Sequence, residues 1–107
     1  MIAKKHRTKD GKLILAVCDT EIFGKEHIES IRCLDLTSEF YNGDEMDKPT
    51  VLSLMKKAYM LNLAGEKSIK LAIDNGFIID KNIKMICKIP YAQALVLTNS
   101  KQTISQA

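Results

Sequence analysis

A short polar segment at residues 62–66 holds the residue types best suited to binding a small ligand. It places an amide, Asn62, close to a glycine and a carboxylate, Gly65 and Glu66. A helix is expected to begin here, and its unpaired backbone N–H groups can bind an anion. The alternative is that Glu66 caps the helix itself, favoured by the helix dipole. Together with an upstream glycine and cation, the candidate ligand-binding set is Gly24, Lys25, Asn62, Gly65 and Glu66.

A second polar interruption, Pro90-Tyr91-Ala92-Gln93, combines an aromatic ring with an amide. Such a pair can stack on a nucleobase and bind its edge. The alternative is that Tyr91 closes the end of the hydrophobic core. With 6% aromatic residues and no Trp, the chain lacks the aromatic platform of the common RNA-binding domains.

Catalytic chemistry is poorly supported by the sequence. His6 and His27 are the only histidines, and neither has metal-binding or triad-like spacing. Cys18, Cys33 and Cys87 are odd in number and form no C-x-x-C pair, which argues against disulfides and zinc and favours buried thiols. We therefore predict no catalytic residue, metal ligand or cofactor. A non-enzymatic protein is favoured, while an enzyme stays open.

The charge is unevenly distributed along the chain. Residues 1–12 carry five basic residues and one acid, a net charge of +4, and residues 48–107 carry nine lysines and three acids, a net +6. Between them, residues 13–47 have a net charge of −7. If the two basic segments share one face, that face can bind RNA phosphates; otherwise the charge is scattered over the surface. The candidate RNA-binding set is Lys4, Lys5, Arg7, Lys84, Lys88, Tyr91 and Gln93.

Composition predicts one soluble domain. The chain has 107 residues, of which 46% are hydrophobic and 27% charged, values typical of globular proteins. No apolar run approaches the roughly 18 residues of a membrane span, and no signal peptide is evident. We expect a cytoplasmic protein with no membrane association, a domain at residues 1–98, and a polar, disordered tail at residues 99–107.

Two helices and about five strands are predicted. Asp47 and Pro49 favour a helix start, and apolar residues at three- and four-residue spacing extend that helix to Leu61. After a break at residues 62–66, a second helix ends at Asn75-Gly76. Strands are expected at residues 1–8, 13–18, 28–37, 83–89 and 92–98, with an Asp10-Gly11 hairpin turn, a bulge in the third strand, and Pro90 ending the fourth. This predicts an α+β fold: a mainly antiparallel sheet with both helices on one face.

Six short segments, in this order and spacing, resemble the archaeal domain of unknown function family 424. They are Ala16-Val17-Cys18-Asp19, Phe23-Gly24-Lys25, Glu39-Phe40-Tyr41-Asn42-Gly43, Asn62-Leu63-Ala64-Gly65-Glu66, Ala72-Ile73-Asp74-Asn75-Gly76-Phe77-Ile78 and Ile89-Pro90-Tyr91-Ala92-Gln93. The resemblance implies a compact α+β fold in an archaeal cytoplasmic protein and carries no activity. The chain departs from the family at Tyr91, where a histidine is usual, and at Ala64, where a bulkier aliphatic is usual. The first departure weakens any proton-transfer role for that loop.

Three functional hypotheses follow. The first is a non-enzymatic protein that contacts RNA, in the ribosome or another translation component, through the basic segments. The second is a small-molecule or anion site, with or without catalysis, formed where the loops around Gly24, residues 62–66 and residues 91–93 converge in one pocket. The third is a protein-interaction module that exposes Phe40 and Tyr41 beside the acidic segment.

Overall fold

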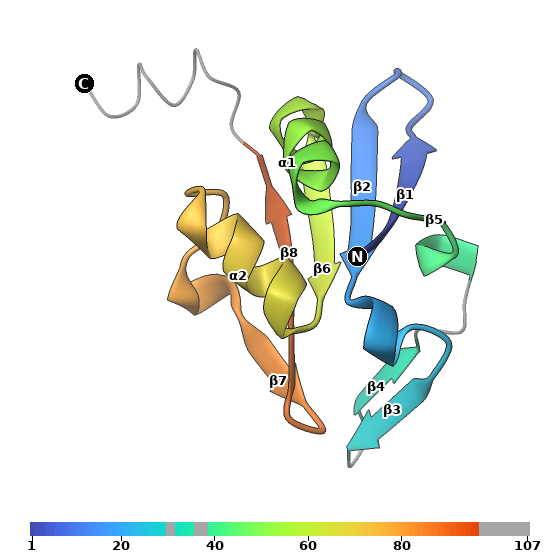
Figure 1. The fold of residues 1–107 in the computed structure, drawn as a ribbon, viewed down its shortest axis with the longest axis vertical. Coiled ribbons are helices and arrows are strands. Elements are labelled where there is room, and N and C mark those ends of the chain that lie inside the picture. The colour runs from blue at the N-terminus through green and yellow to red at the C-terminus, as the bar shows by residue number, and fades with distance from the viewer. Residues whose placement is uncertain (30–31, 36–38, 97–107) are drawn as a thin grey trace.

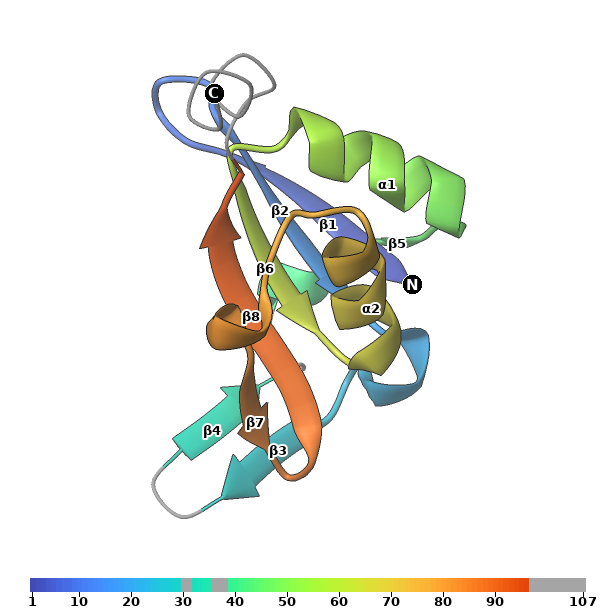
Figure 2. The ribbon, with the colours of Figure 1, turned by 90° about the vertical axis from the view of Figure 1, so that its left-hand side faces the viewer.

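A six-stranded sheet carries two helices on one face, as the computed structural model of residues 1–29, 32–35 and 39–96 shows (Figures 1 and 2). The strand order is β5-β1-β2-β6-β8-β7, and a separate two-stranded sheet pairs β3 with β4. The strands are β1 (Ile2–Arg7), β2 (Leu13–Cys18), β3 (Glu26–Glu29), β4 (Arg32–Asp35), β5 (Asp44–Glu45), β6 (Met60–Ala64), β7 (Lys84–Ile86) and β8 (Ile89–Leu95). The helices are α1 (Lys48–Lys57) and α2 (Glu66–Asp74), with short 3-10 turns η1 (Thr20–Ile22), η2 (Glu39–Tyr41) and η3 (Asp80–Asn82). The predicted α+β class, with two helices on one face of a mainly antiparallel sheet, is confirmed.

The N-terminal hairpin forms as predicted. Gly11 has φ +87°, the left-handed conformation that its turn requires. β1 pairs with β2 in antiparallel register, from Ile2 opposite Cys18 to Arg7 opposite Leu13. The next step through the sheet, from β2 to β6, is parallel. A parallel step needs a long crossover connection, and α1 lies within it.

The first helix is shorter than predicted, and a strand follows it. α1 begins after its N-cap Asp47, whose carboxylate accepts a hydrogen bond from the Thr50 backbone N–H at 3.0 Å, and it ends at Lys57. The expected break at residues 62–66 is instead largely strand β6, which pairs with β2 and β8. Leu61 and Leu63 are buried on the helix-covered side, with Asn62 between them on the other. This alternation with a period of two identifies a strand, and its Leu61 happens to continue the helical spacing.

The other differences concern β-hairpins. The sequence predicts a single strand at residues 28–37. Within the described residues of that range, 28–29 belong to β3 and 32–35 to β4, and the two strands pair in antiparallel fashion. The strand expected at residues 83–89 is β7 and the start of β8, joined by Cys87 and Lys88. Pro90 does not end a strand. It lies within β8, opposite Met85 of β7 and just past the last residue pair between β6 and β8, which joins Ala64 to Tyr91. β8 ends at Leu95, earlier than the predicted residue 98, and the predicted tail lies outside the described residues.

Cys87 and Lys88 both adopt positive φ angles, +49° and +64°, in the β7–β8 turn. Two-residue hairpins with positive φ at both positions favour glycine at the second, because a side chain there is strained. Replacing Lys88 with glycine should therefore raise the free energy of unfolding by about 1 kcal/mol. Urea unfolding measures this change, and Lys88→Gln, which removes the charge and keeps the strained Cβ, is the control. A Lys88→Gly protein no more stable than Lys88→Gln would contradict the turn geometry.

The main core lies between the sheet and the helices. Leu15, Leu61 and Leu63 of the sheet pack there with Val51 and Met55 of α1. A smaller cluster on the opposite side of the sheet packs the ring of Tyr41 from η2 against Ala16, Cys18 and Ala64. η2 therefore covers part of the face that the helices leave open.

Candidate functional site

The strand register aligns predicted site residues on the sheet face opposite α1 and α2, which we call the distal face. One row across β1, β2, β6 and β8 consists of Lys4, Ala16, Asn62 and Gln93. The next row includes Tyr91 of β8 with Lys84 of β7 opposite it. Asn62 and Tyr91 share this face because side chains alternate along a strand and directly paired residues point the same way.

These residues surround a hollow of about 280 Å³, the distal hollow, lined by Tyr41, Asn62, Leu63, Asn82, Lys84, Tyr91, Ala92 and Gln93. Among these lining residues there is no carboxylate, and Lys84 supplies a positive charge. Within the described part of the chain, no group hydrogen-bonds the half-buried Asn62 side chain, and Gln93 makes only a weak contact, from Nε2 to the Met60 sulfur at 3.4 Å. The hollow thus offers two tyrosine side chains and two amides with hydrogen-bonding capacity to spare.

Neighbouring residues hold the walls of this hollow. The Asn82 side chain accepts a hydrogen bond from the Ile79 backbone N–H at 2.8 Å, which closes the η3 turn. On the opposite wall, Tyr41 is 9% exposed, and the Phe40 ring beside it stacks on His6 with ring centroids 4.5 Å apart. A ring nitrogen of His6 lies 2.8 Å from the Phe40 carbonyl oxygen. The exposed aromatic patch expected for Phe40 and Tyr41 is therefore not formed, because both side chains pack on the sheet.

Burial of two ionisable side chains, Cys18 and Tyr41, makes the free energy of unfolding fall at alkaline pH. It raises the pKa of the Cys18 thiol from 9.0 to about 12, with the charge of Asp19 adding to the effect, and burial raises the pKa of Tyr41 from 10.0 to about 12. Above pH 9 the unfolded chain loses a proton that folded Cys18 keeps, so stability is full below pH 9 and falls up to about pH 12. The expected slope is about 1.4 kcal/mol per pH unit for each group.

Urea unfolding from pH 8 to 11 tests this dependence. Cys18→Ala should flatten the decline that begins near pH 9, and Tyr41→Phe the part above pH 10. Slopes that match the wild type in both variants would show that other groups cause the decline.

The sequence also predicts buried thiols for the other two cysteines. Cys87 is exposed, contrary to the buried position expected for it, and the Cys33 side chain lies outside what the structure describes.

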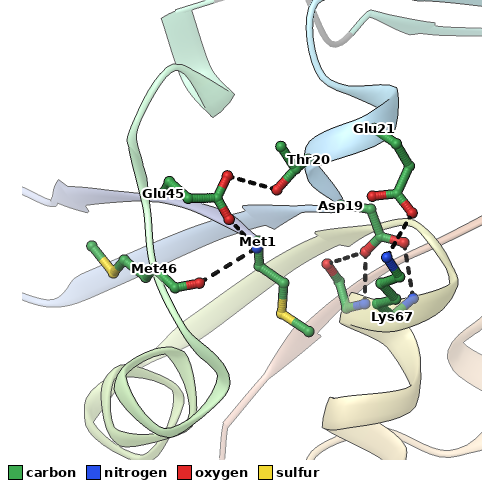
Figure 3. A network of polar contacts seen from close by, with 8 residues as sticks. Met1, Asp19, Thr20, Glu21, Glu45, Met46 and Lys67 are labelled. Atoms are coloured by element: carbon green, nitrogen blue, oxygen red, sulfur yellow. Dashed lines mark hydrogen bonds and ion pairs between the residues drawn. The ribbon is translucent and has the colours of Figure 1, made fainter.

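The N-terminus of α2 is occupied by a carboxylate of the protein itself. Asp19, 3% exposed, follows β2 and accepts three hydrogen bonds at the start of α2. The Lys67 N–H donates to Oδ2 at 2.9 Å, and the Ser68 N–H and hydroxyl donate to Oδ1 at 2.8 and 2.7 Å (Figure 3). Glu66, which the sequence suggested as the capping residue, is exposed. Asp19 satisfies the unpaired amides that an anionic ligand would need.

The hollow beside this helix start, the α2 hollow, is unsuited to an anion. Its volume is about 160 Å³, and it is lined by Asp19, Glu21, Ile22, Gly65, Glu66, Lys88, Ile89 and Pro90. Three of these residues are acidic and one is basic. Glu21 also forms an ion pair with Lys67 at 3.1 Å. The pKa of the Glu21 carboxyl is lowered, first by a hydrogen bond from its own backbone and then by Lys67. The same ion pair raises the pKa of Lys67.

A second network holds η1 next to this region (Figure 3). The Met1 amino group donates to Glu45 Oε2 at 2.7 Å and to the Met46 carbonyl oxygen at 3.4 Å. Glu45 Oε1 accepts a hydrogen bond from the Thr20 hydroxyl at 2.7 Å. The network joins β1, β5 and η1, and its bonds to the amino group and to Thr20 lower the pKa of Glu45.

The structure divides both predicted site sets. Of the RNA-binding candidates, Lys4, Lys84, Tyr91 and Gln93 lie on the distal face. By strand alternation Lys5 and Arg7 point to the other side of β1, where Arg7 donates to the Gly11 carbonyl oxygen at 3.0 Å. Lys88 lies in the turn at the α2 hollow.

The ligand-binding candidates do not converge in one pocket. Asn62 lines the distal hollow, Gly65 and Glu66 line the α2 hollow, and Gly24 and Lys25 line neither. Of the loops expected to converge, only Asn62 lies in the same hollow as Tyr91 and Gln93. Two further residues at these places, Asp19 and Asn82, were missed, because nothing local in the sequence relates Asp19 to a helix that begins 47 residues later.

The model for a protein family of unknown function, DUF424, matches residues 6–97. The chain belongs to the DUF424 family. This confirms the resemblance in the six sequence segments. The fold of the chain is similar to that in the crystal structure of an uncharacterized conserved protein from Methanopyrus kandleri, with a TM-score of 0.76, 23% sequence identity, and 92% of each chain covered. No curated protein sequence matches the chain.

Within residues 1–29, 32–35 and 39–96, no three or more His, Cys, Asp or Glu side chains are grouped so as to hold a metal ion. In the same residues, neither helix is long and apolar enough to cross a membrane.

Proposed function

We propose that this DUF424 protein is a non-enzymatic RNA-binding protein of the cytoplasm, which contacts the ribosome or another translation component through its distal face. The observation that carries the proposal is the composition of the distal hollow. Two tyrosines, three amide side chains and Lys84 line it, and none of its lining residues is acidic. RNA presents flat bases, polar base edges and phosphates, which match these three kinds of side chain.

Charge favours the distal hollow over the α2 hollow as the RNA contact. Phosphates approaching the α2 hollow meet Asp19, Glu21 and Glu66, and like charges brought together raise the energy of binding. At the distal face they meet Lys84 at one edge. Lys4 lies in the row of Asn62, two strands away, which corresponds to about 10 Å at ordinary strand spacing.

Fluorescence anisotropy with a labelled 20-nucleotide RNA of random sequence, at 50 and 200 mM KCl, tests this proposal. We expect binding that weakens steeply with salt, because neutralised phosphates release counterions. Lys84→Gln should weaken binding several-fold and make the salt slope shallower by about one unit. Lys57→Gln, which removes the same charge from α1 on the opposite side of the sheet, is the matched control.

Salt-insensitive binding, or equal effects of Lys84→Gln and Lys57→Gln, would contradict the proposal. Binding of a free mononucleotide at the distal hollow without binding of RNA would contradict the proposal and indicate a small-molecule site formed by the distal hollow alone. That outcome would move the function from RNA to a metabolite while keeping the same residues.

A further inference from the structure

We infer that the distal hollow receives one unstacked base of single-stranded RNA. This inference rests on the proposed function and adds the form of RNA that is recognised. It follows from the shape of the hollow, from the chemistry of its floor and from the position of its lysine.

The shape favours an unpaired base. Asn62 and Gln93 are directly opposite each other on β6 and β8, and such pairs have Cβ atoms about 5 Å apart. The Asn62 side chain is half-buried, so a group must enter the hollow to reach its amide, whereas the Gln93 side chain beside it is exposed. In an A-form duplex the bases are stacked and paired inside the helix, whereas an unpaired base can be splayed out from the strand.

The floor of the hollow matches a base in both polarity and flatness. An amide offers a donor and an acceptor side by side, as the edge of a base does. The side-chain amide of Asn62, on the central strand β6, has no hydrogen-bond partner among the described residues. A half-buried amide normally hydrogen-bonds a protein group, water or ligand. The half-buried Tyr91 ring packs against the smaller core cluster, as expected for a residue that closes the core, and its remaining surface lines the hollow, where it can contact the base.

Lys84 lies where the phosphate backbone of the bound RNA must pass. Lys84 is exposed on the edge strand β7 and lines the same hollow. A nucleotide whose base occupies the hollow keeps its phosphate outside, near this edge. The charge therefore stabilises the backbone, while Asn62, Gln93 and Tyr91 contact the base.

Anisotropy titrations with three labelled 12-nucleotide RNAs test the inference: a single strand without self-complementarity, its duplex, and the same strand with abasic ribose at the six central positions. We expect the single strand to bind at least about 10-fold more tightly than the other two, because stacking on an aromatic side chain contributes about 1–3 kcal/mol per base. Tyr91→Leu and Asn62→Val should each weaken binding of the single strand about 5- to 10-fold, and leave duplex binding unchanged.

Asn62→Val also controls for folding. Valine favours strands more than asparagine, so this variant should melt at the same or a higher temperature while it binds RNA less well. Affinity for the single strand unchanged in both variants would overturn the hollow as the base site. Equal binding of all three RNAs would overturn the inference and leave the proposed function standing, whereas no binding of any RNA would overturn the proposed function itself.

Discussion

Replacing Asp19 with alanine is expected to lower the free energy of unfolding by about 3 kcal/mol. The substitution removes an acceptor of three hydrogen bonds and leaves two backbone N–H groups and the buried Ser68 hydroxyl without their partner. It also removes a negative charge from the N-terminus of a helix, where the helix dipole favours one. The loss should be larger than for an ordinary N-cap because this carboxylate is buried and joins β2 to α2.

Asp47→Ala supplies the matched control for this prediction. Asp47 caps α1 from the adjacent residue and is exposed, so its loss should cost about 1 kcal/mol. Urea unfolding followed by far-ultraviolet circular dichroism compares the two variants. Equal losses would mean that Asp19 is an ordinary cap and does not hold the sheet to α2.

Replacing Gly65 with alanine is expected to lower the free energy of unfolding by at least about 3 kcal/mol. Gly65 has φ +108°, and a Cβ atom built on it would lie 2.3 Å from Cγ of Asp19. Alanine would therefore be strained in its backbone and would also displace the carboxylate that caps α2. The two costs add because relieving the clash means giving up the Asp19 hydrogen bonds.

Gly76→Ala separates backbone strain from the clash. Gly76 also has a positive φ, +77°, but nothing lies within 4 Å of the Cβ position. Its substitution should cost only about 1 kcal/mol, the strain of a side chain in the left-handed region. If Gly65→Ala lowers the free energy of unfolding no more than Gly76→Ala in the same urea experiment, the Asp19 carboxylate does not lie as close to Gly65 as the structure places it.

Both predictions bear on the ligand site first expected at the start of α2. The sequence correctly placed a helix N-terminus after Gly65, and such a terminus is a general anion site. Asp19 fills it from outside the helix, at a separation in sequence that no local pattern reveals. The chemistry of the site was predictable in kind, but the identity of the anion, a side chain of the same protein, was not.

Local signals predicted much of the fold. The Asp10-Gly11 turn defined the first hairpin, the apolar run of β2 marked an interior strand, and Asp47 and Gly76 marked helix ends. Each of these residues acts on its own neighbours through turn geometry or capping, so the sequence alone carries the information.

Elements without a local signal were predicted wrongly. β6 has five residues, and its Leu61 lies at helical spacing from the apolar residues of α1, so the strand resembled a continuation of that helix. The β7–β8 turn contains Cys87 and Lys88 in place of the glycine or asparagine that usually adopts positive φ. In both places the tertiary pairing of β8 with its neighbours overrides the local preference.

The distal hollow was predictable residue by residue but not as a group. Asn62, Tyr91, Gln93 and Lys84 were all candidates from the sequence, because each is a polar or aromatic residue in an apolar setting. The two candidate sets listed Asn62 apart from the other three, and the hypothesis that joined it to residues 91–93 also included Gly24 and Glu66, because the correct grouping depends on the β6–β8–β7 register. Knowing that register moves Asn62 from the helix start to the sheet face, beside the RNA-binding candidates.

Ultraviolet crosslinking of the protein to single-stranded RNA, followed by mass spectrometry of the crosslinked peptides, tests the central claim most directly. If the distal face binds RNA, crosslinks will concentrate on the β7–β8 segment around Tyr91, and Tyr91→Leu will reduce them while leaving the fold intact. Crosslinks confined to α1 and α2, on the opposite side of the sheet, would contradict the claim.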